Sequence, residues 1–331
     1  MIVVDRSAVN NENQNASWPS EQRRYLARSL CYKILQALLV NNAFQRDLHV
    51  TRPIELGIST CPNDTFAFHA LMNRLVDWRG LDFHVRLLDI QQLNDGLFRN
   101  EFDVAKTSFH AALLLSEETV VLPSGSAMGF GVGPLLLSAR SEGAGTPEDE
   151  NKTTLCPGEH TTATLLLKIF HPKTVNIKQV VFSEIMPMLQ QKEADFGVCI
   201  HEGRFTWQDQ GLGRVEDLGE RWETESTTPL PLGGIVARRV LPADVTAKVQ
   251  QVIHDSIAFA MANRDAPLPT MRKYAQEFSD EVLLKHVDLY VNDWTLDLGD
   301  VGRHAITILS RRAREAGIGT EKAIEVFRMP T

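Results

Sequence analysis

From Pro53 onward, short apolar runs alternate with segments of helical periodicity, and this alternation limits the possible folds more than any other feature. The strand-like runs "IELGIST", "LDFHVRLLDI" and "FDVAKTS" are separated by the helix-like runs "DTFAFHALMNRLV" and "QQLNDGLFRN". This order favours an α/β fold with a largely parallel sheet. A second set of the same kind extends from "TTLCPG" to "VEDLGERWETES". The sequence therefore predicts two α/β lobes.

Two extended stretches rich in glycine and proline, "GPLLLSAR" and "PLGGIVARR", flank the second set. We expect the chain to leave lobe one along the first crossing and to return along the second, so that the helical C-terminal segment packs on lobe one. Two crossings form a hinge, and the cleft between the lobes is the expected ligand site. The predicted layout is an N-terminal extension (1–50, partly disordered with one helix), lobe one (51–138 and 232–331) and lobe two (139–231).

Charge and cysteine content restrict the classes of partner. The 331 residues carry a formal net charge of -8, whereas a nucleic acid or an anionic membrane normally requires a basic face. Four scattered cysteines contain no C-x-x-C pair and suggest neither a zinc site nor a disulfide framework. The polar leader lacks the basic start of an export signal. We expect a cytoplasmic protein without membrane or nucleic-acid partners, and the sequence leaves the oligomeric state open.

Two helix starts follow predicted strands and could bind an anion. In "STCPNDTFAFHAL", Asn63 or Asp64 is a suitable N-cap, and Thr65 lies in the first turn. In "CPGEHTTATLLL", Thr161 and Thr162 occupy the equivalent place in lobe two. A capped helix without a ligand explains each motif alone. The pair, one from each lobe, favours a converging anion site.

A third set of polar residues, Lys106, Thr107 and Ser108, lies at the end of the predicted strand "FDVAKTS" and precedes a predicted helix. The lysine could neutralise a carboxylate that the hydroxyl groups orient. A surface lysine beside an N-cap serine is an equally good interpretation. The motif alone does not separate the two.

The stretch "FGVCIHEGRF" delivers His201 at the end of a strand in lobe two. It is not an H-E-x-x-H zinc motif, because Phe205 stands at the position of the second histidine. A histidine satisfied at a strand end is the ordinary interpretation, but α/β lobes bind ligands beyond the carboxyl ends of their strands. We therefore predict His201 as a general base. Glu202 and Arg204 could contact substrate, brace His201 or pair between lobes, and strand alternation favours bracing.

Several stretches together resemble one family, the 1,4-dihydroxy-6-naphthoate synthases of the futalosine route to menaquinone. The resemblance covers the chain from about Ile54 to the C-terminus and rests on segments that occur in the family's order. These are "STCPNDTFAFHAL", "AKTSFHAALLL", "SGSAMGFGVGPLLL", "PGEHTTATLLL", "IMPMLQQKEADFGVCIHEGRFT", "LPLGGIVARR" and "SDEVLLKHVDLYVNDWTLDLG".

The resemblance implies a fold like that of the type II periplasmic binding proteins and a lyase without metal or organic cofactor. It implies cleavage of cyclic de-hypoxanthine futalosine, a small anionic substrate, to 1,4-dihydroxy-6-naphthoate and dihydroxyacetone. The family's proton-accepting histidine falls on His201. Its substrate-contacting residues fall on Lys106, Thr107 and Ser108, and on Thr162 and Ala163.

Two departures from the family pattern stand near these residues. Thr60 replaces a proline in the turn before Asn63, and Gly203 replaces a serine two residues after His201. Two alternatives share the expected fold: a non-catalytic solute-binding protein and the sister family of chorismate dehydratases. The first predicts an export signal, and the second lacks the C-P-N-D-T and I-H-E-x-R-F signatures.

Overall fold

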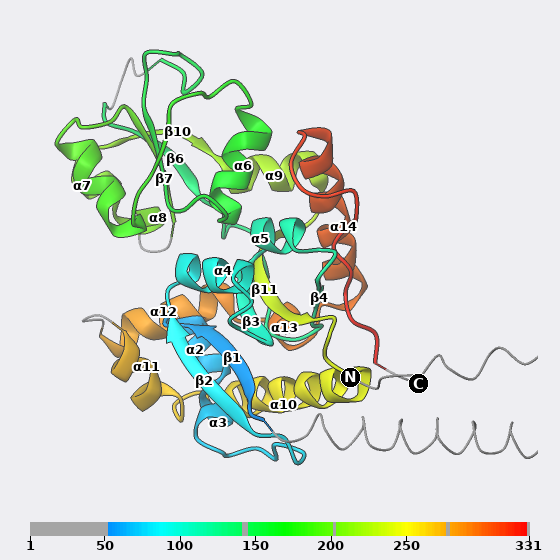
Figure 1. Cartoon of the computed structure of the whole chain (residues 1–331). Coiled ribbons are helices and arrows are strands. Elements are labelled where there is room, and N and C mark those ends of the chain that lie inside the picture. Colours follow the sequence, from blue (N-terminus) through cyan, green and yellow to red (C-terminus); the bar gives the residue numbers. More distant parts are fainter. Residues whose placement is uncertain (1–51, 141–144, 201–202, 276–278, 330–331) are drawn as a thin grey trace, which may run out of the picture. The chain divides into compact units, whose positions relative to one another are not determined.

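A computed structural model describes residues 52–140, 145–200, 203–275 and 279–329. The chain divides into two units, Met1–Arg52 and Pro53–Thr331. The predicted N-terminal extension, 1–50, lies outside the described residues, and so do His201 and Glu202. The second unit contains all the described helices and strands (Figure 1).

The first sheet of this unit has the order β2-β1-β3-β11-β4, and β5 also pairs with β11. The strands β1, β2 and β3 are mutually parallel, whereas β11 runs antiparallel to β3, β4 and β5. The bounds are β1 (Ile54–Ser59), β2 (Phe83–Leu88), β3 (Val104–Ser108), β4 (Thr119–Val121), β5 (Ala127–Gly129) and β11 (Leu230–Arg238).

The second sheet has the order β10-β6-β9-β7-β8. The strands β7, β8 and β9 are parallel, and β6 is antiparallel to both β9 and β10. The bounds are β6 (Leu135–Ser138), β7 (Thr154–Cys156), β8 (Ile177–Gln179), β9 (Phe196–Cys199) and β10 (Gly213–Asp217).

The unit has two halves, the first built around the first sheet and the second around the second sheet. Helices connect the strands in both halves. Those before the second crossing are α2 (Pro62–Ala67), α3 (His69–Met72), α4 (Ile90–Phe98), α5 (Phe109–Leu114), α6 (Thr162–Phe170), α7 (Ile185–Gln190), α8 (Gly203–Thr206) and α9 (Leu218–Ser226), with 3-10 turns η1 (Phe182–Glu184) and η2 (Gln208–Gln210). Those after it are α10 (Ala243–Ala262), α11 (Leu268–Tyr274), α12 (Asp280–Tyr290), α13 (Asp293–Leu296) and α14 (Gly299–Glu315). None of the described helices is both long and apolar enough to span a bilayer.

Local sequence explains where α4 and α6 begin. Asp89 and Gln92 form a capping box at the start of α4. The side chain of each residue accepts a hydrogen bond from the backbone N–H of the other. Thr161 caps α6 by accepting a hydrogen bond from the backbone N–H of Thr164. Both helices then bury a continuous apolar face that contributes to one core cluster with α5 and α14.

Apolar packing covers both faces of the first sheet. One cluster joins β1, β3 and β11 to α3 and α10, and α10 lies along this side of the sheet in Figure 1. Another cluster contains side chains of α4 and α5 together with α6, β9 and α9 from the second half. This second cluster therefore extends from the first sheet to the second sheet.

Both predicted crossings exist, but they are paired strands of the sheets that they enter. The prediction assigned residues 135–138 to lobe one, whereas β6 lies inside the second sheet between β9 and β10. The prediction also expected largely parallel sheets, whereas β11 and β6 are antiparallel to their neighbours. The reason is geometric, because a strand that arrives from the other half enters the sheet from its opposite end.

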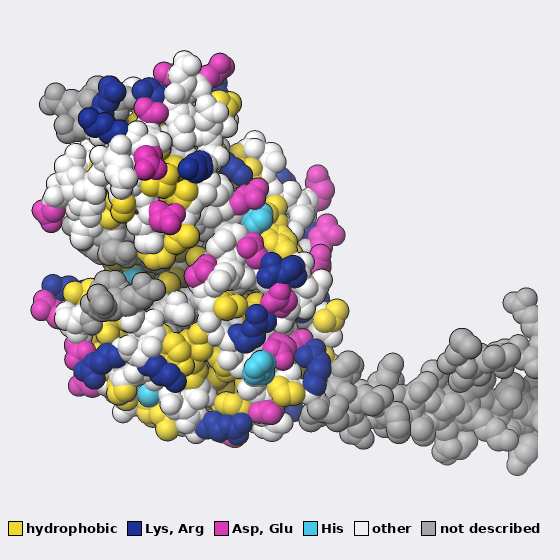
Figure 2. Space-filling view, turned by 60° about the vertical axis from the view of Figure 1, so that its left-hand side comes forward, with side chains coloured by type: hydrophobic (Ala, Val, Ile, Leu, Met, Phe, Trp, Pro, Cys, Tyr) yellow, Lys and Arg dark blue, Asp and Glu magenta, His cyan; other side chains and the backbone are white. Residues whose placement is uncertain are grey.

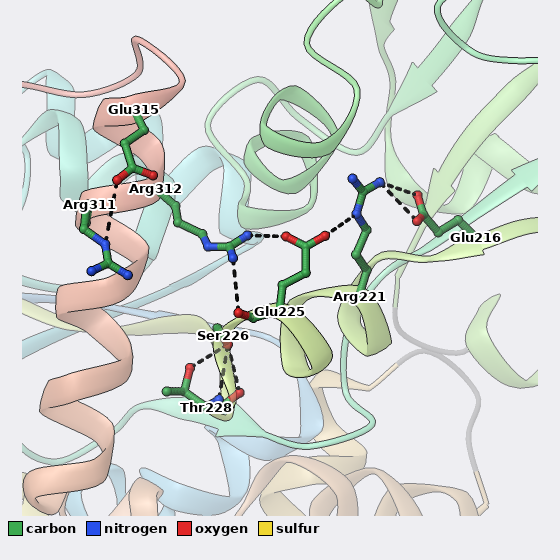
Figure 3. Close-up of polar contacts among 8 residues, drawn as sticks. All are labelled: Glu216, Arg221, Glu225, Ser226, Thr228, Arg311, Arg312 and Glu315. Carbon is green, nitrogen blue, oxygen red and sulfur yellow. Dashed lines mark hydrogen bonds and ion pairs between the residues drawn. The ribbon is translucent and has the colours of Figure 1, made fainter.

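Charged side chains connect the C-terminal helix to the second half (Figure 3). Arg312 of α14 donates to Glu225 of α9, and Arg221 binds both Glu225 and Glu216 on β10. Arginine hydrogen bonds, first that of Arg312 and then that of Arg221, lower the pKa of the Glu225 carboxyl group. These pairs are partly exposed, so we expect each to contribute at most about 1 kcal/mol to stability.

Candidate active site

One pocket is lined by residues from both halves of the unit. First-sheet segments contribute the turn after β1, the end of β3 and part of β11, and the second half contributes the start of α6 and Ile200. Its volume of about 110 Å³ is several times what one water molecule requires. Figure 2 shows that the surface is hollowed between the two halves on one face.

Seven of the residues predicted from sequence line this pocket. They are Asn63, Asp64, Lys106, Ser108, Thr161, Thr162 and Ala163. They come from α2, β3 and α6, which are separated in the sequence but meet here. The fold therefore brings together the two predicted helix starts and the predicted lysine.

Strand alternation separates Thr107 from its neighbours. Lys106 and Ser108 face the pocket, while the Thr107 hydroxyl group donates to the Asn94 side chain at 2.9 Å. Asn94 is buried on α4 and also donates to Ser108 Oγ at 3.2 Å. Asn94 thus fixes the oxygen of Ser108, and sequence reasoning missed this supporting role. Thr65 also lies outside the pocket, since its hydroxyl group binds the carbonyls of Cys61 and Pro62.

The start of α2 differs from the prediction that Asn63 or Asp64 is the N-cap. Cys61 occupies the N-cap position, and Pro62 is the first helical residue. Proline is favoured there because its missing N–H would have no helical partner in any case. Asn63 and Asp64 therefore lie within the first turn, where the negative charge of Asp64 compensates the positive helix end.

Lys106 has a partner that the sequence did not predict. Its Nζ lies 2.6 Å from Asp64 Oδ1 and 3.2 Å from the carbonyl oxygen of Gly125. Both charged side chains are buried. An ammonium group has three N–H donors, and these contacts use two. The pair is neutral as a whole. Lys106 therefore interacts with a substrate mainly as a hydrogen-bond donor and less as a positive charge.

The start of α6 confirms the predicted helix boundary, with Thr161 as N-cap and Thr162 as the first helical residue. The Thr162 hydroxyl group donates across the pocket to the carbonyl of Leu232 on β11. His110 of α5 lies behind the same turn, with Nδ1 3.2 Å from the Thr161 carbonyl. Burial, with the nearby charge of Lys168, lowers the pKa of His110 to about 4, so this histidine is neutral at pH 7.

The predicted base and its neighbours can be located only in part. His201 and Glu202 lie outside the described residues, but Ile200, the residue before them, lines the pocket at the end of β9. After them the chain forms the short helix α8, so the extended alternation assumed for Arg204 does not continue. Arg204 donates to the Gly133 carbonyl at 2.7 Å and forms an ion pair with Asp217 at 2.7 Å. These contacts fix α8 against the first crossing.

Sequence reasoning missed the contribution of α12. His286 and Tyr290 both line the pocket, and they lie one helical turn apart. Their i, i+4 spacing on an amphipathic segment was the available signal. Side chains of Ile90, Val132, Pro134, Ile200 and Leu232 form apolar parts of the wall. A mostly apolar pocket with a few convergent polar groups suits a small organic ligand.

The described ranges contain no cluster of three or more His, Cys, Asp or Glu side chains that could hold a metal ion. Cys156 on β7 is a free, buried cysteine. Burial raises the pKa of the Cys156 thiol to about 12, so this group is not a nucleophile near neutral pH.

Solved structures establish the fold. A protein from Archaeoglobus fulgidus superposes with a TM-score of 0.74 at 31% identity, covering 81% of this chain and 99% of that one. The ligand-binding component of an ABC-type import system from Staphylococcus aureus gives a TM-score of 0.59 at 14% identity, with 83% and 97% covered. The periplasmic aliphatic sulphonate-binding protein of Escherichia coli gives 0.53 at 12%, with 84% and 97% covered. The fold is that of the periplasmic binding proteins, as predicted.

Sequence comparisons identify the family. A curated 1,4-dihydroxy-6-naphthoate synthase from Thermus thermophilus is 37% identical over 274 residues, covering 83% of this chain and 98% of that protein. One from Streptomyces coelicolor is 36% identical over 271 residues, with 80% and 94% covered. A family model described as menaquinone biosynthesis matches residues 54–315. The chain belongs to this menaquinone biosynthesis family.

Proposed function

We propose that this protein is a 1,4-dihydroxy-6-naphthoate synthase, a lyase that converts cyclic de-hypoxanthine futalosine to 1,4-dihydroxy-6-naphthoate and dihydroxyacetone. The curated relatives carry that name. The observation that carries the proposal is the pocket. Ile200, the residue immediately before His201, lines this pocket together with Lys106 and Thr162. The three predicted segments therefore converge.

The substrate combines an aryl carboxylate with a sugar-derived ring, and the pocket has groups for both. Lys106, Ser108 and the first N–H groups of α6 supply donors for a carboxylate. Neutral His201 abstracts a proton from the sugar-derived part, which opens the ring and leads to carbon–carbon cleavage. Aromatisation of the naphthoate makes release of dihydroxyacetone favourable.

No organic cofactor or metal has a role in this proposal, and the reaction is placed in the cytoplasm. The four scattered cysteines, which contain no C-x-x-C pair, favour a reducing location. On the face shown in Figure 2, acidic and basic side chains are interspersed. This distribution fits a small-molecule substrate better than a polyanion, which would favour a continuous basic surface.

The decisive test is to incubate the protein with cyclic de-hypoxanthine futalosine and, separately, with chorismate, and to identify products by mass spectrometry. We expect 1,4-dihydroxy-6-naphthoate and dihydroxyacetone from the first substrate only. Turnover of chorismate would instead indicate the sister dehydratase. Tight binding without turnover of either compound would indicate a solute-binding protein.

The role of His201 has its own test. We expect His201→Ala to lower kcat by about 10²- to 10⁴-fold, the usual contribution of a general base, while product affinity stays near that of the wild type. The matched control is His304→Ala on the exposed side of α14, which should leave kcat unchanged. Near wild-type turnover by His201→Ala would rule out this assignment.

A further inference from the structure

The carboxyl ends of β1 and β3 bring two serines to the same edge of the first sheet. β1 ends at Ser59 and β3 ends at Ser108, and the two strands are parallel neighbours. Both serines line the pocket, together with Lys106 of β3. The mechanism proposed above gives Ser59 no role, and it does not determine which way the hydroxyl group of Ser108 points.

Asn94 determines the direction of the hydrogen bond at Ser108. The backbone N–H of Ser108 donates to Asn94 Oδ1 at 3.1 Å, and the Thr107 hydroxyl group donates to the same oxygen at 2.9 Å. Because a backbone N–H only donates, the amide oxygen must face this side, and the NH₂ group must face the other. Asn94 Nδ2 therefore donates to Ser108 Oγ, which lies 3.2 Å away. The Ser108 oxygen thus acts as an acceptor, and its own proton is left to donate.

The same arrangement exists at Ser59. Its Oγ accepts a hydrogen bond from the backbone N–H of Cys61 at 3.1 Å, and the residue is only 2% exposed. In the part of the chain that the structure describes, no group accepts the hydroxyl proton of Ser59 or that of Ser108. A buried hydroxyl donor without an acceptor is unfavourable. The pocket that both residues line is the space in which a ligand can supply the acceptor.

Lys106 adds a third donor to this edge of the pocket. Its contacts with Asp64 and with the Gly125 carbonyl use two of the three N–H groups, so one remains for a ligand. We call Ser59, Lys106 and Ser108 the donor corner. Each member offers a proton, and the matching ligand group is one that only accepts. An ionised carboxylate is such a group, because its two oxygens accept several hydrogen bonds and donate none.

We propose that the donor corner binds the carboxylate of the ligand, that Ser59 is a further substrate-contacting residue, and that Asn94 is the positioning residue that holds the Ser108 hydroxyl group as a donor. This inference rests on the proposed function, in which the substrate carries an aryl carboxylate. Specificity follows, because a carboxamide replaces one acceptor oxygen by an NH₂ group. Two donors then face each other, and neither is satisfied.

The wild-type protein provides the first test. Isothermal titration calorimetry without oxygen measures the affinity for 1,4-dihydroxy-6-naphthoate and for its carboxamide, which has the same rings and hydroxyl groups. We expect the carboxylate to bind at least about tenfold more tightly, the effect of one hydrogen bond lost in the carboxamide complex. Equal affinities, or no binding of the carboxylate, would overturn the inference.

The variant Asn94→Asp tests the positioning role. Its carboxylate still accepts from Thr107 and from the Ser108 backbone, but it has no NH₂ group to donate. The Ser108 hydroxyl group therefore turns its proton towards residue 94 and its oxygen towards the pocket. We expect weaker binding of the naphthoate and tighter binding of the carboxamide than in the wild type. Charge repulsion alone would weaken the naphthoate without improving the carboxamide. Unchanged affinities in a folded Asn94→Asp protein would refute the role of Asn94.

The variant Ser59→Ala tests the new contact. We expect its affinity for the naphthoate to fall about tenfold, the effect of one lost hydrogen bond. Ser256→Ala is the matched control, because Ser256 is also buried and also accepts a hydrogen bond from a backbone N–H, that of Leu71 at 3.0 Å. Its affinity should equal that of the wild type. If Ser59→Ala binds the naphthoate as tightly as Ser256→Ala does, Ser59 is not a contact.

Turnover and binding separate this inference from the proposed function. Wild-type protein that does not cleave cyclic de-hypoxanthine futalosine refutes the proposed function, while a tenfold preference for the carboxylate over the carboxamide still supports the donor corner. Conversely, an active wild type without that preference leaves the proposed function in place and refutes the donor corner.

Discussion

At the scale of single residues, the buried pair Lys106–Asp64 determines the electrostatics of the pocket. The two side chains are 6% and 4% exposed, so neither charge is well solvated without the other. If Lys106 contacts the substrate carboxylate, as the family resemblance implies, its substitution mainly raises KM. The structure adds a second effect, because removal of the lysine leaves a buried carboxylate without its counter-ion.

We expect Lys106→Met to lower the free energy of unfolding by about 3–5 kcal/mol, the usual result of breaking a buried pair. The double variant Lys106→Met/Asp64→Asn contains no uncompensated charge and should recover most of that loss. Urea unfolding measures both variants. If the double variant binds the naphthoate as tightly as the wild type, Lys106 has no role in binding the ligand.

At the scale of elements, the close packing of the first crossing against α9 depends on two glycines that contact each other. A Cβ atom at Gly133 would lie 2.2 Å from Cα of Gly219 and 2.7 Å from its backbone nitrogen. Backbone atoms cannot move away as a side chain could. By contrast, a Cβ atom at Gly203 in α8 would lie 3.3 Å or more from its nearest neighbours, which are side-chain atoms of Cys199 and Met186. A side chain at Gly203 therefore requires these neighbours to shift by only a few tenths of an ångström.

We expect Gly133→Ala to destabilise the protein by about 1–3 kcal/mol, because the methyl group forces the crossing away from α9. Gly203→Ala is the matched control, and its melting temperature should stay close to that of the wild type. Differential scanning calorimetry compares the three proteins. Equal melting temperatures for both variants would show that the contact between Gly133 and Gly219 is not close in solution.

At the scale of the Pro53–Thr331 unit, contacts around the start of α6 join the two sheets. The Thr162 hydroxyl group binds β11, His110 of α5 binds the Thr161 carbonyl, and the ring of His160 packs on Phe98 of α4. Thr161 and Thr162 also line the pocket. Stability and the shape of the site therefore depend on one set of contacts.

His110 makes this set sensitive to pH. Burial lowers its pKa to about 4 in the folded state, compared with 6.5 when unfolded. Between these values the unfolded chain binds a proton that the folded chain does not, so stability is complete above pH 6.5 and decreases as the pH falls towards 4. The loss amounts to at most roughly 3 kcal/mol.

We expect the melting temperature of the wild type to fall between pH 7.5 and 5, and to fall less in His110→Gln, which cannot be protonated. His304→Gln should retain the wild-type decrease. Identical pH profiles for the wild type and His110→Gln would exclude His110 as the origin of the effect.

Element order and type follow from the sequence, and the structure bears out many of these predictions. The alternation after Pro53, the helix start at Thr162 and the strand that ends next to His201 are visible in local patterns, because periodicity and capping depend on residues a few positions apart. The strand pairing of the crossings was not visible. It depends on which distant segment lies beside each strand, and periodicity carries no information about that.

The sequence by itself therefore determined two α/β halves, their extended crossings and most of the polar residues of the pocket. Only the tertiary structure decided how those residues act on one another. Lys106 meets Asp64 across 42 positions, and His286 meets Asn63 across 223. Such pairs form because packing of the sheets and helices brings distant side chains within hydrogen-bond distance.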